Sequence, residues 1–119
     1  MQYINEVKFM GLTKTEQYSK MQNELAVILK ALGHPARIAI VEYLLKVDQC
    51  ICNDLVEELP LSQSTISQHL LELKQAGIIQ GTIEGNSKCY CLQKQNLAKV
   101  MKFVSKCVSS LSLDKIKCC

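Results

Sequence analysis

The sequence predicts a mainly α-helical domain of five or so helices that carries a small antiparallel β-hairpin of two to three strands. Three observations support this fold class. Apolar residues recur every three or four positions along most of the 119 residues, as in amphipathic helices. Ser, Pro and Gly separate these segments, and the apolar period changes to two after Gly77. A domain of this length buries only about two-thirds of its unfolded surface, so a partner subunit would add stability.

Two long helices are expected before residue 48. The first spans residues 15–32 and ends where Gly33, His34 and Pro35 interrupt the pattern. Pro35 suits the first position of the second helix, which extends to about Val47. His34 is expected to cap or pack this turn rather than bind a metal, because no Cys or His follows it at ligand spacing. The residues expected to face the core are Met21, Leu25, Ile28, Leu29 and Leu32 in the first helix and Ile38, Val41, Leu44 and Leu45 in the second.

The segment from residue 48 to 77 has the order of a helix-turn-helix. A brief strand within residues 48–53 and a short helix at residues 54–59 precede a longer helix, which Ser62 caps and Gly77 ends. Two helices joined by a tight turn, here through Pro60, form a helix-turn-helix in which the second helix is the reader. The apolar residues expected in its core are Leu61, Ile66, Leu70 and Leu73.

Short amide and hydroxyl side chains cover the opposite face of the reading helix. Such groups hydrogen-bond base edges and phosphates in a DNA major groove. Taken alone, the same face also fits an ordinary solvated amphipathic helix. The polar residues are Gln63, Ser64, Ser67, Gln68, Glu72 and Lys74.

Two strands and a last helix follow the reading helix. Residues 78–83 and 88–92 are predicted strands joined by a turn at residues 84–87, which makes a hairpin, or wing. The polar and basic tip of this wing, with Asn86 and Lys88, suits a phosphate or minor-groove contact, although it also fits a plain polar turn. The last helix spans residues 96–111, and its apolar stripe is interpreted as a dimer seam shared with the first long helix rather than as core. This stripe consists of Leu97, Val100, Met101, Val104, Val108 and Leu111.

The chain divides into a loose N-terminal arm at residues 1–14, a domain at residues 15–112 and a tail at residues 113–119 that contains Cys118 and Cys119. The N-terminus includes Glu6 and no long apolar segment, so neither a signal peptide nor a membrane span is expected. A cytoplasmic location follows. The formal net charge of +3 is mild, and it neither demands nor excludes a nucleic-acid partner.

The order of the elements is that of a winged helix-turn-helix. Four segments, ALGHPARIAIVEYL, CICNDLVEEL, LSQSTISQHLLELKQAGII and EGNSKCYCL, resemble the ArsR/SmtB family of metal-sensing repressors over about residues 25–95. The resemblance implies a homodimer built on the first and last helices, which binds an inverted-repeat operator when no inducer is present. It implies a structural or backbone-contacting role for His69. Base-side contacts are implied for Gln63, Ser64, Ser67 and Gln68, and phosphate contacts for Thr65, Lys74 and Lys88.

Seven cysteines are many for such a chain, and without a secretory signal their thiols are expected to be reduced. In a winged helix, the strand before the turn motif usually pairs with the second wing strand. That pairing would bring four thiols together as a soft-metal or metalloid site, or as a redox pair. Buried Cys that act as small apolar residues are the alternative. The four are Cys50, Cys52, Cys89 and Cys91, and the competing site is Cys107 with Cys118 and Cys119.

The thiol pattern departs from the family in two places. Arsenic- and cadmium-sensing members carry the motif CVCDL, whereas this chain reads CICNDL, so Asn53 shifts Cys50 and Cys52 by one position. The zinc site of other members lies in the last helix and needs Asp and His ligands. Residues 96–119 contain no His, so that site is not expected.

These features predict a DNA-binding repressor that needs no cofactor and leaves its operator when its thiols bind arsenite, antimonite, zinc, cadmium or copper(I). One alternative is a repressor that senses redox state or reactive sulfur. Others are a DNA binder with structural cysteines and a metal-binding or protein-interaction module that has kept the fold. An enzyme is not expected, because a nucleophilic Cys needs a base and both His34 and His69 have structural explanations.

Overall fold

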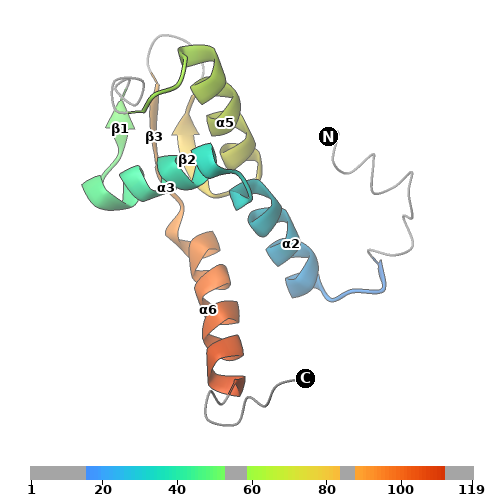
Figure 1. The fold of residues 1–119 in the computed structure, drawn as a ribbon. Coiled ribbons are helices and arrows are strands. Elements are labelled where there is room, and N and C mark those ends of the chain that lie inside the picture. The colour runs from blue at the N-terminus through green and yellow to red at the C-terminus, as the bar shows by residue number, and fades with distance from the viewer. Residues whose placement is uncertain (1–15, 53–58, 84–87, 112–119) are drawn as a thin grey trace.

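The computed structural model describes residues 16–52, 59–83 and 88–111. Within these ranges the chain forms four long helices and a three-stranded antiparallel sheet (Figure 1), which confirms the predicted fold class. Residues 1–14, most of the expected helix at residues 54–59, the wing tip with Asn86, and the tail with Cys118 and Cys119 lie outside the described residues. The elements are α2 (Lys20–Leu32), α3 (Pro35–Val47), β1 (Ile51–Cys52), α5 (Gln63–Gln75), β2 (Ile79–Thr82), β3 (Cys89–Leu92) and α6 (Lys94–Ser110).

Local capping determines where the first two helices begin. Ser19 accepts a hydrogen bond from the backbone N–H of Gln22, and the Gln22 side chain accepts one from the backbone N–H of Ser19. This capping box starts α2 at Lys20 rather than at residue 15. His34 caps α3 as expected, because its Nδ1 accepts the N–H of Ala36 at 3.1 Å.

The core lies between α2, α3, α5 and the inner face of the sheet. Ile40, Leu73 and Ile78 are fully buried in it. The predicted core of the reading helix is confirmed at Ile66 and Leu70, and Leu61 packs against it while partly exposed.

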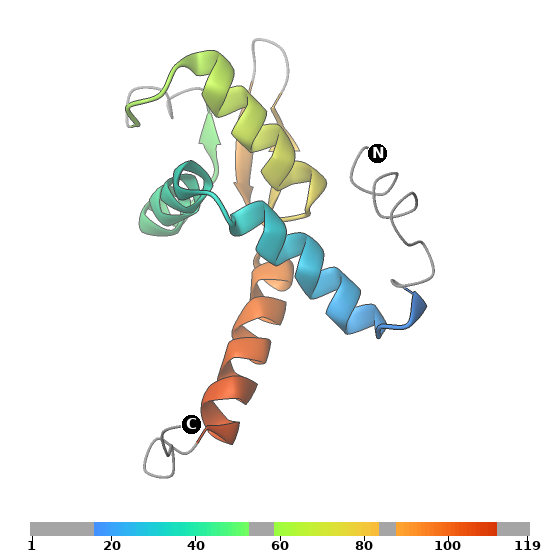
Figure 2. The ribbon, with the colours of Figure 1, turned by 45° about the vertical axis from the view of Figure 1, so that its right-hand side comes forward.

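Four residues predicted to face the core are instead exposed: Met21, Leu29, Ile38 and Leu45. On α3 the buried side is formed by Ile40, Val41 and Leu44. Ile38 and Leu45 lie about a quarter turn around the helix from that side, since successive residues advance by about 100°. Met21 lies in the first turn of α2, at the end of that helix farther from the sheet (Figure 2), so the core does not reach it.

The sheet has the strand order β1-β3-β2, with β3 paired antiparallel to both neighbours. Ile51 lies opposite Tyr90 and Cys52 lies opposite Cys89. This register confirms the expectation that the strand before the helix-turn-helix pairs with the second strand of the wing. Both Ile51 and Tyr90 are buried, so the paired β1 and β3 present their other face outward.

Helix α6 extends away from the sheet, and the first half of α6 contacts α2 (Figures 1 and 2). None of its residues is buried. Leu97 and Val100 pack against the core, whereas the rest of the apolar stripe faces solvent in the single chain. No described helix is both long enough and apolar enough to cross a membrane. The large apolar residues that are exposed on α6 and at its C-cap are Met101, Phe103, Val104, Val108 and Leu111.

Gly81 provides a test of the sheet. Its φ is +122°, and a Cβ at this position would overlap the carbonyl oxygen of Cys89 and lie 2.8 Å from the Cα of Tyr90. We expect Gly81→Ala to lower the free energy of unfolding by about 2 kcal/mol, measured by urea denaturation. Gly33→Ala is the control, because φ there is −78° and the new Cβ would meet its nearest atom at 3.4 Å. Equal losses in the two variants would contradict the described β2–β3 contact.

Candidate DNA interface and thiol site

The reading helix α5 is held at both ends by hydrogen bonds. At the start, the Ser62 hydroxyl accepts the N–H of Thr65 at 3.3 Å and lies 2.8 Å from its hydroxyl, as the predicted cap requires. At the end, Gly77 has a φ of +78°, which is the left-handed conformation expected there. The side-chain amide of Asn96, in the first turn of α6, donates to the carbonyl of Gly77 at 2.8 Å. The sequence analysis missed this contact between the reader and α6.

The outward face of α5 carries the polar residues predicted to contact DNA. Ser64, Thr65, Gln68 and Lys74 are exposed, Ser67 is half-buried, and Gln63 is the first residue of the helix. The Gln68 amide donates to Glu72 at 3.3 Å one turn along. These residues therefore lie on a helix whose opposite side is anchored in the core, and their contacts with DNA remain predictions.

The wing meets this face through Lys88. Its Nζ donates a hydrogen bond of 3.3 Å to the hydroxyl of Ser67, which lies 21 residues earlier in the sequence. Both side chains are half-buried. Two residues that the sequence analysis assigned to separate DNA contacts thus belong to one cluster.

A cluster of His34, Arg37 and His69 holds the inner side of the reading helix. Nε of Arg37 donates to Nδ1 of His69 at 3.2 Å, and its guanidinium also donates to the carbonyl of Ala31. The rings of His34 and His69 lie 4.5 Å apart, and His69 is buried, as its structural interpretation expects. Burial lowers the pKa of His69, and the neighbouring His34 and Arg37 lower it further, against a smaller opposite effect of Glu72. Sequence reasoning missed Arg37, although an Arg within an apolar helix is itself a signal.

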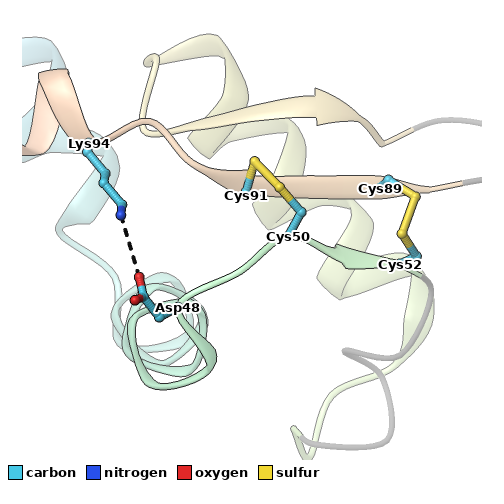
Figure 3. The surroundings of a disulfide bond; sticks show 6 residues. All are labelled: Asp48, Cys50, Cys52, Cys89, Cys91 and Lys94. Atoms are coloured by element: carbon cyan, nitrogen blue, oxygen red, sulfur yellow. Dashed lines mark ion pairs between the residues drawn. A yellow bond between two sulfur atoms is a disulfide. The ribbon is translucent and has the colours of Figure 1, made fainter.

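Four cysteines lie together on the sheet (Figure 3). Disulfides join Cys50 to Cys91 and Cys52 to Cys89, with Cα–Cα distances of 4.2 Å in both pairs. Such short distances are typical of antiparallel residue pairs that do not exchange backbone hydrogen bonds. Since Ile51 and Tyr90 face inward, the sulfurs are on the outward face. The expectation that these thiols are reduced is wrong for this structure, because the strand register brings each pair into bonding range.

Metal binding at this site requires reduced sulfur, because the thiolate is the ligand and a disulfide supplies none. With the disulfides in place, no group of three or more His, Cys, Asp or Glu side chains in residues 16–52, 59–83 and 88–111 is arranged to hold a metal ion. Reduction would leave four thiols on one face, which is a donor set that fits a thiophilic ion. Of the competing site, Cys107 is a free, half-buried thiol on α6.

Around these disulfides the surface is polar. Lys94, at the start of α6, pairs with Asp48, at the end of α3, at 3.5 Å beside the Cys50–Cys91 bridge (Figure 3). Both partners are largely exposed, so this pair adds little stability. Cys50 is exposed and Cys91 is half-buried, so the bridge is reachable from solvent.

A helix-turn-helix with a polar reading helix and an adjoining wing defines a winged-helix DNA-binding protein. Residues 34–80 match the family described as "Bacterial regulatory protein, arsR family". The chain is 30% identical over 91 residues to the HTH-type transcriptional regulator Rv0081 of Mycobacterium tuberculosis H37Rv. The matched residues cover 76% of this chain and 80% of that protein. It is also 35% identical over 74 residues to the arsenical resistance operon repressor of Staphylococcus xylosus, covering 62% and 70%. The chain therefore belongs to the ArsR/SmtB family.

Solved structures share the fold. An ArsR family transcriptional regulator, RHA00566, shares the fold with a TM-score of 0.66 at 16% identity, over 84% of this chain and all of that one. HlyU from Vibrio cholerae has a TM-score of 0.57 at 26% identity, over 76% and 99%. The relatives are transcription regulators, so the chain is a regulator and not an enzyme, as predicted.

The His69 cluster makes stability depend on pH. Since folding lowers the pKa of His69, the unfolded chain takes up this proton at a higher pH than the folded chain does. Stability should therefore be fully present above about pH 6.5 and fall as the pH drops below it. We expect the free energy of unfolding, measured by urea denaturation at pH 7.5 and 5.5, to fall less in His69→Gln than in the parent chain. An identical fall in both proteins would assign the pH dependence to groups other than His69.

Proposed function

We propose that the protein is a cytoplasmic, homodimeric transcriptional repressor whose operator affinity is controlled by Cys50, Cys52, Cys89 and Cys91. The observation that carries this proposal is the position of these cysteines. They join the strand just before the helix-turn-helix to the strand of the wing. A change in sulfur chemistry there acts on both DNA-contacting parts.

The effector that best fits reduced thiols is a soft metal or metalloid ion such as arsenite. Four thiols on one face offer the three sulfur ligands of a pyramidal ion, and soft ligands also accept zinc, cadmium or copper(I). Relatives named as an arsenical resistance operon repressor and as the HTH-type transcriptional repressor SmtB support this choice. The chain spans about half of that SmtB protein.

A second candidate is a repressor that responds to oxidation or reactive sulfur. The two disulfides favour it, because each pair of sulfurs is placed to form and break a bond reversibly. Strand β1 contains only two residues, and disulfides join Cys52 of this strand and the preceding Cys50 to β3. Oxidation and ion binding would act on the same strand pair and are separated by experiment.

Dimerisation is proposed through α6 together with α2. The exposed apolar side chains of α6 form a stripe with no covering in the single chain, and such a surface is typical of an interface. Lys99 of α6 donates to Glu24 of α2 at 2.8 Å and lowers the pKa of that carboxyl. This contact fixes the two helices relative to each other. A two-fold dimer then presents two reading helices about 34 Å apart, one turn of DNA, which matches an inverted repeat.

The test of function is fluorescence anisotropy with DNA from upstream of the protein's own gene. Fully reduced protein should bind this DNA, and a panel of arsenite, antimonite, zinc, cadmium and copper(I) should reveal one ion that weakens binding by about 5- to 150-fold. A disulfide-forming oxidant is tested separately. Loss of affinity only with the oxidant would favour the redox candidate over the ion sensor.

The control is a variant with Ser at all four cysteines. It should bind the same DNA and respond to neither ion nor oxidant. A response that survives in this variant would move the sensor elsewhere, with Cys107 as the next residue to replace.

Charge placed in the proposed dimer seam should separate the subunits. We expect the double variant Val104→Glu and Val108→Glu to sediment as a monomer in analytical ultracentrifugation and to lose at least about tenfold in operator affinity, because both half-sites are no longer held together. Ser109→Glu adds a charge to the same helix outside the apolar stripe and should remain dimeric. A double variant that still sediments as a dimer would contradict this seam.

A further inference from the structure

The hydrogen bond between Lys88 and Ser67 has a defined direction. A lysine ammonium carries three donors and no acceptor, so the Ser67 oxygen accepts at 3.3 Å. The single hydrogen of the Ser67 hydroxyl is then left to donate to another group. Because Ser67 lies on the outward face of α5, that other group can belong to DNA.

Ser64 on the same helix is paired differently. Its hydroxyl lies 3.3 Å from the hydroxyl of Ser62, and the hydrogen of Ser62 is donated to the hydroxyl of Thr65. Ser64 is therefore bonded within the first turn of α5, whereas Ser67 is bonded to the wing. The two serines differ in whether a lysine donates to them.

We propose that Lys88 is a specificity-determining residue of the DNA interface, because its donation to the Ser67 oxygen occupies one of the two lone pairs and favours Ser67 as a hydrogen-bond donor. A donor at this position selects an acceptor on the major-groove edge: N7 of a purine, O6 of guanine or O4 of thymine. The amino groups of adenine and cytosine only donate and cannot accept this hydrogen, so only the second lone pair of the Ser67 oxygen remains for them. Lys88 acts through Ser67, and this role differs from its predicted phosphate contact, since phosphate contacts carry no sequence information. The inference rests on the operator binding proposed above.

The position of Lys88 also links specificity to the thiol site. Lys88 directly precedes Cys89, which is joined to Cys52, and the side chain reaches from there to the reading helix. Breaking the Cys52–Cys89 disulfide would therefore release a covalent restraint on the residue next to Lys88.

The experiment compares binding to operator DNA with binding to a mixed-sequence duplex of equal length at the same salt concentration. Lys88→Met keeps most of the apolar stem and removes the donors. We expect it to lower the ratio of operator to mixed-sequence affinity by roughly fivefold to tenfold. Lys88→Arg retains a donor and should keep most of the ratio. Lys74→Met, a control on the exposed end of α5, should weaken binding to both DNAs by similar factors and leave the ratio within about twofold of the parent value.

A double-mutant cycle assigns the effect to Ser67. Ser67→Ala should lower the affinity ratio by about as much as Lys88→Met, and the double variant should lose little more than either single variant. The matched cycle of Lys88→Met with Ser64→Ala should be additive to within about twofold. Thermal unfolding followed by circular dichroism shows that each variant is folded, and Lys88→Gln replaces Lys88→Met if the latter is not.

Two results would overturn the inference. If Lys88→Met weakens both DNAs equally and is additive with Ser67→Ala, Lys88 is a phosphate contact only. If Ser67→Ala leaves the ratio unchanged, its hydrogen is used within the helix, where serine commonly donates to the carbonyl four residues earlier. Failure of the parent protein to bind its operator would instead refute the proposed function, so the two failures are distinguishable.

Discussion

The pairing of β1 with β3 is the constraint on which the rest of the structure depends. It joins the chain just before the helix-turn-helix to the strand that follows the wing tip, although 37 residues separate Cys52 from Cys89. Ile51 and Tyr90 enter the core from the inner face of this pair. Because side chains alternate along a strand, their burial forces the neighbouring cysteines outward. One register thus determines both the packing of the core and the location of the thiols.

The reading helix is restrained by contacts on both its inner and its outer side. Ile66, Leu70 and Leu73 anchor it in the core, where close packing allows little displacement. Arg37 bonds to His69 on its inner side, and Lys88 bonds to Ser67 on its outer side. A helix restrained in this way presents polar side chains at defined positions, so little conformational entropy remains to be lost on binding DNA.

Much of this arrangement could be predicted from the sequence because it depends on local chemistry. The Ser62 cap, the left-handed Gly77 and the change of period after it each depend on a few neighbouring residues, and they gave the order of elements. Alternation along two short strands also predicted which cysteines would meet, since a paired register brings opposite residues together.

What could not be predicted depends on contacts between distant segments. Helix α3 is apolar on more than one side, so its periodicity could not exclude Ile38 and Leu45 from the core. The partner of Arg37 lies 32 residues away, and no local pattern indicates it. The oxidation state of the cysteines is likewise absent from the sequence, because C-x-C spacing defines a shared face and not a bond.

The hydrogen bond from Asn96 to the carbonyl of Gly77 joins the end of the reading helix to the first turn of α6. In the proposed dimer, α6 belongs to the axis of symmetry, whereas α5 lies at the periphery. This bond therefore connects α6 to the end of the reading helix. A small rotation about this connection would displace the opposite end of the reading helix by a larger distance. In the proposed dimer, the spacing between the two reading helices would then depend on this one side-chain amide of Asn96.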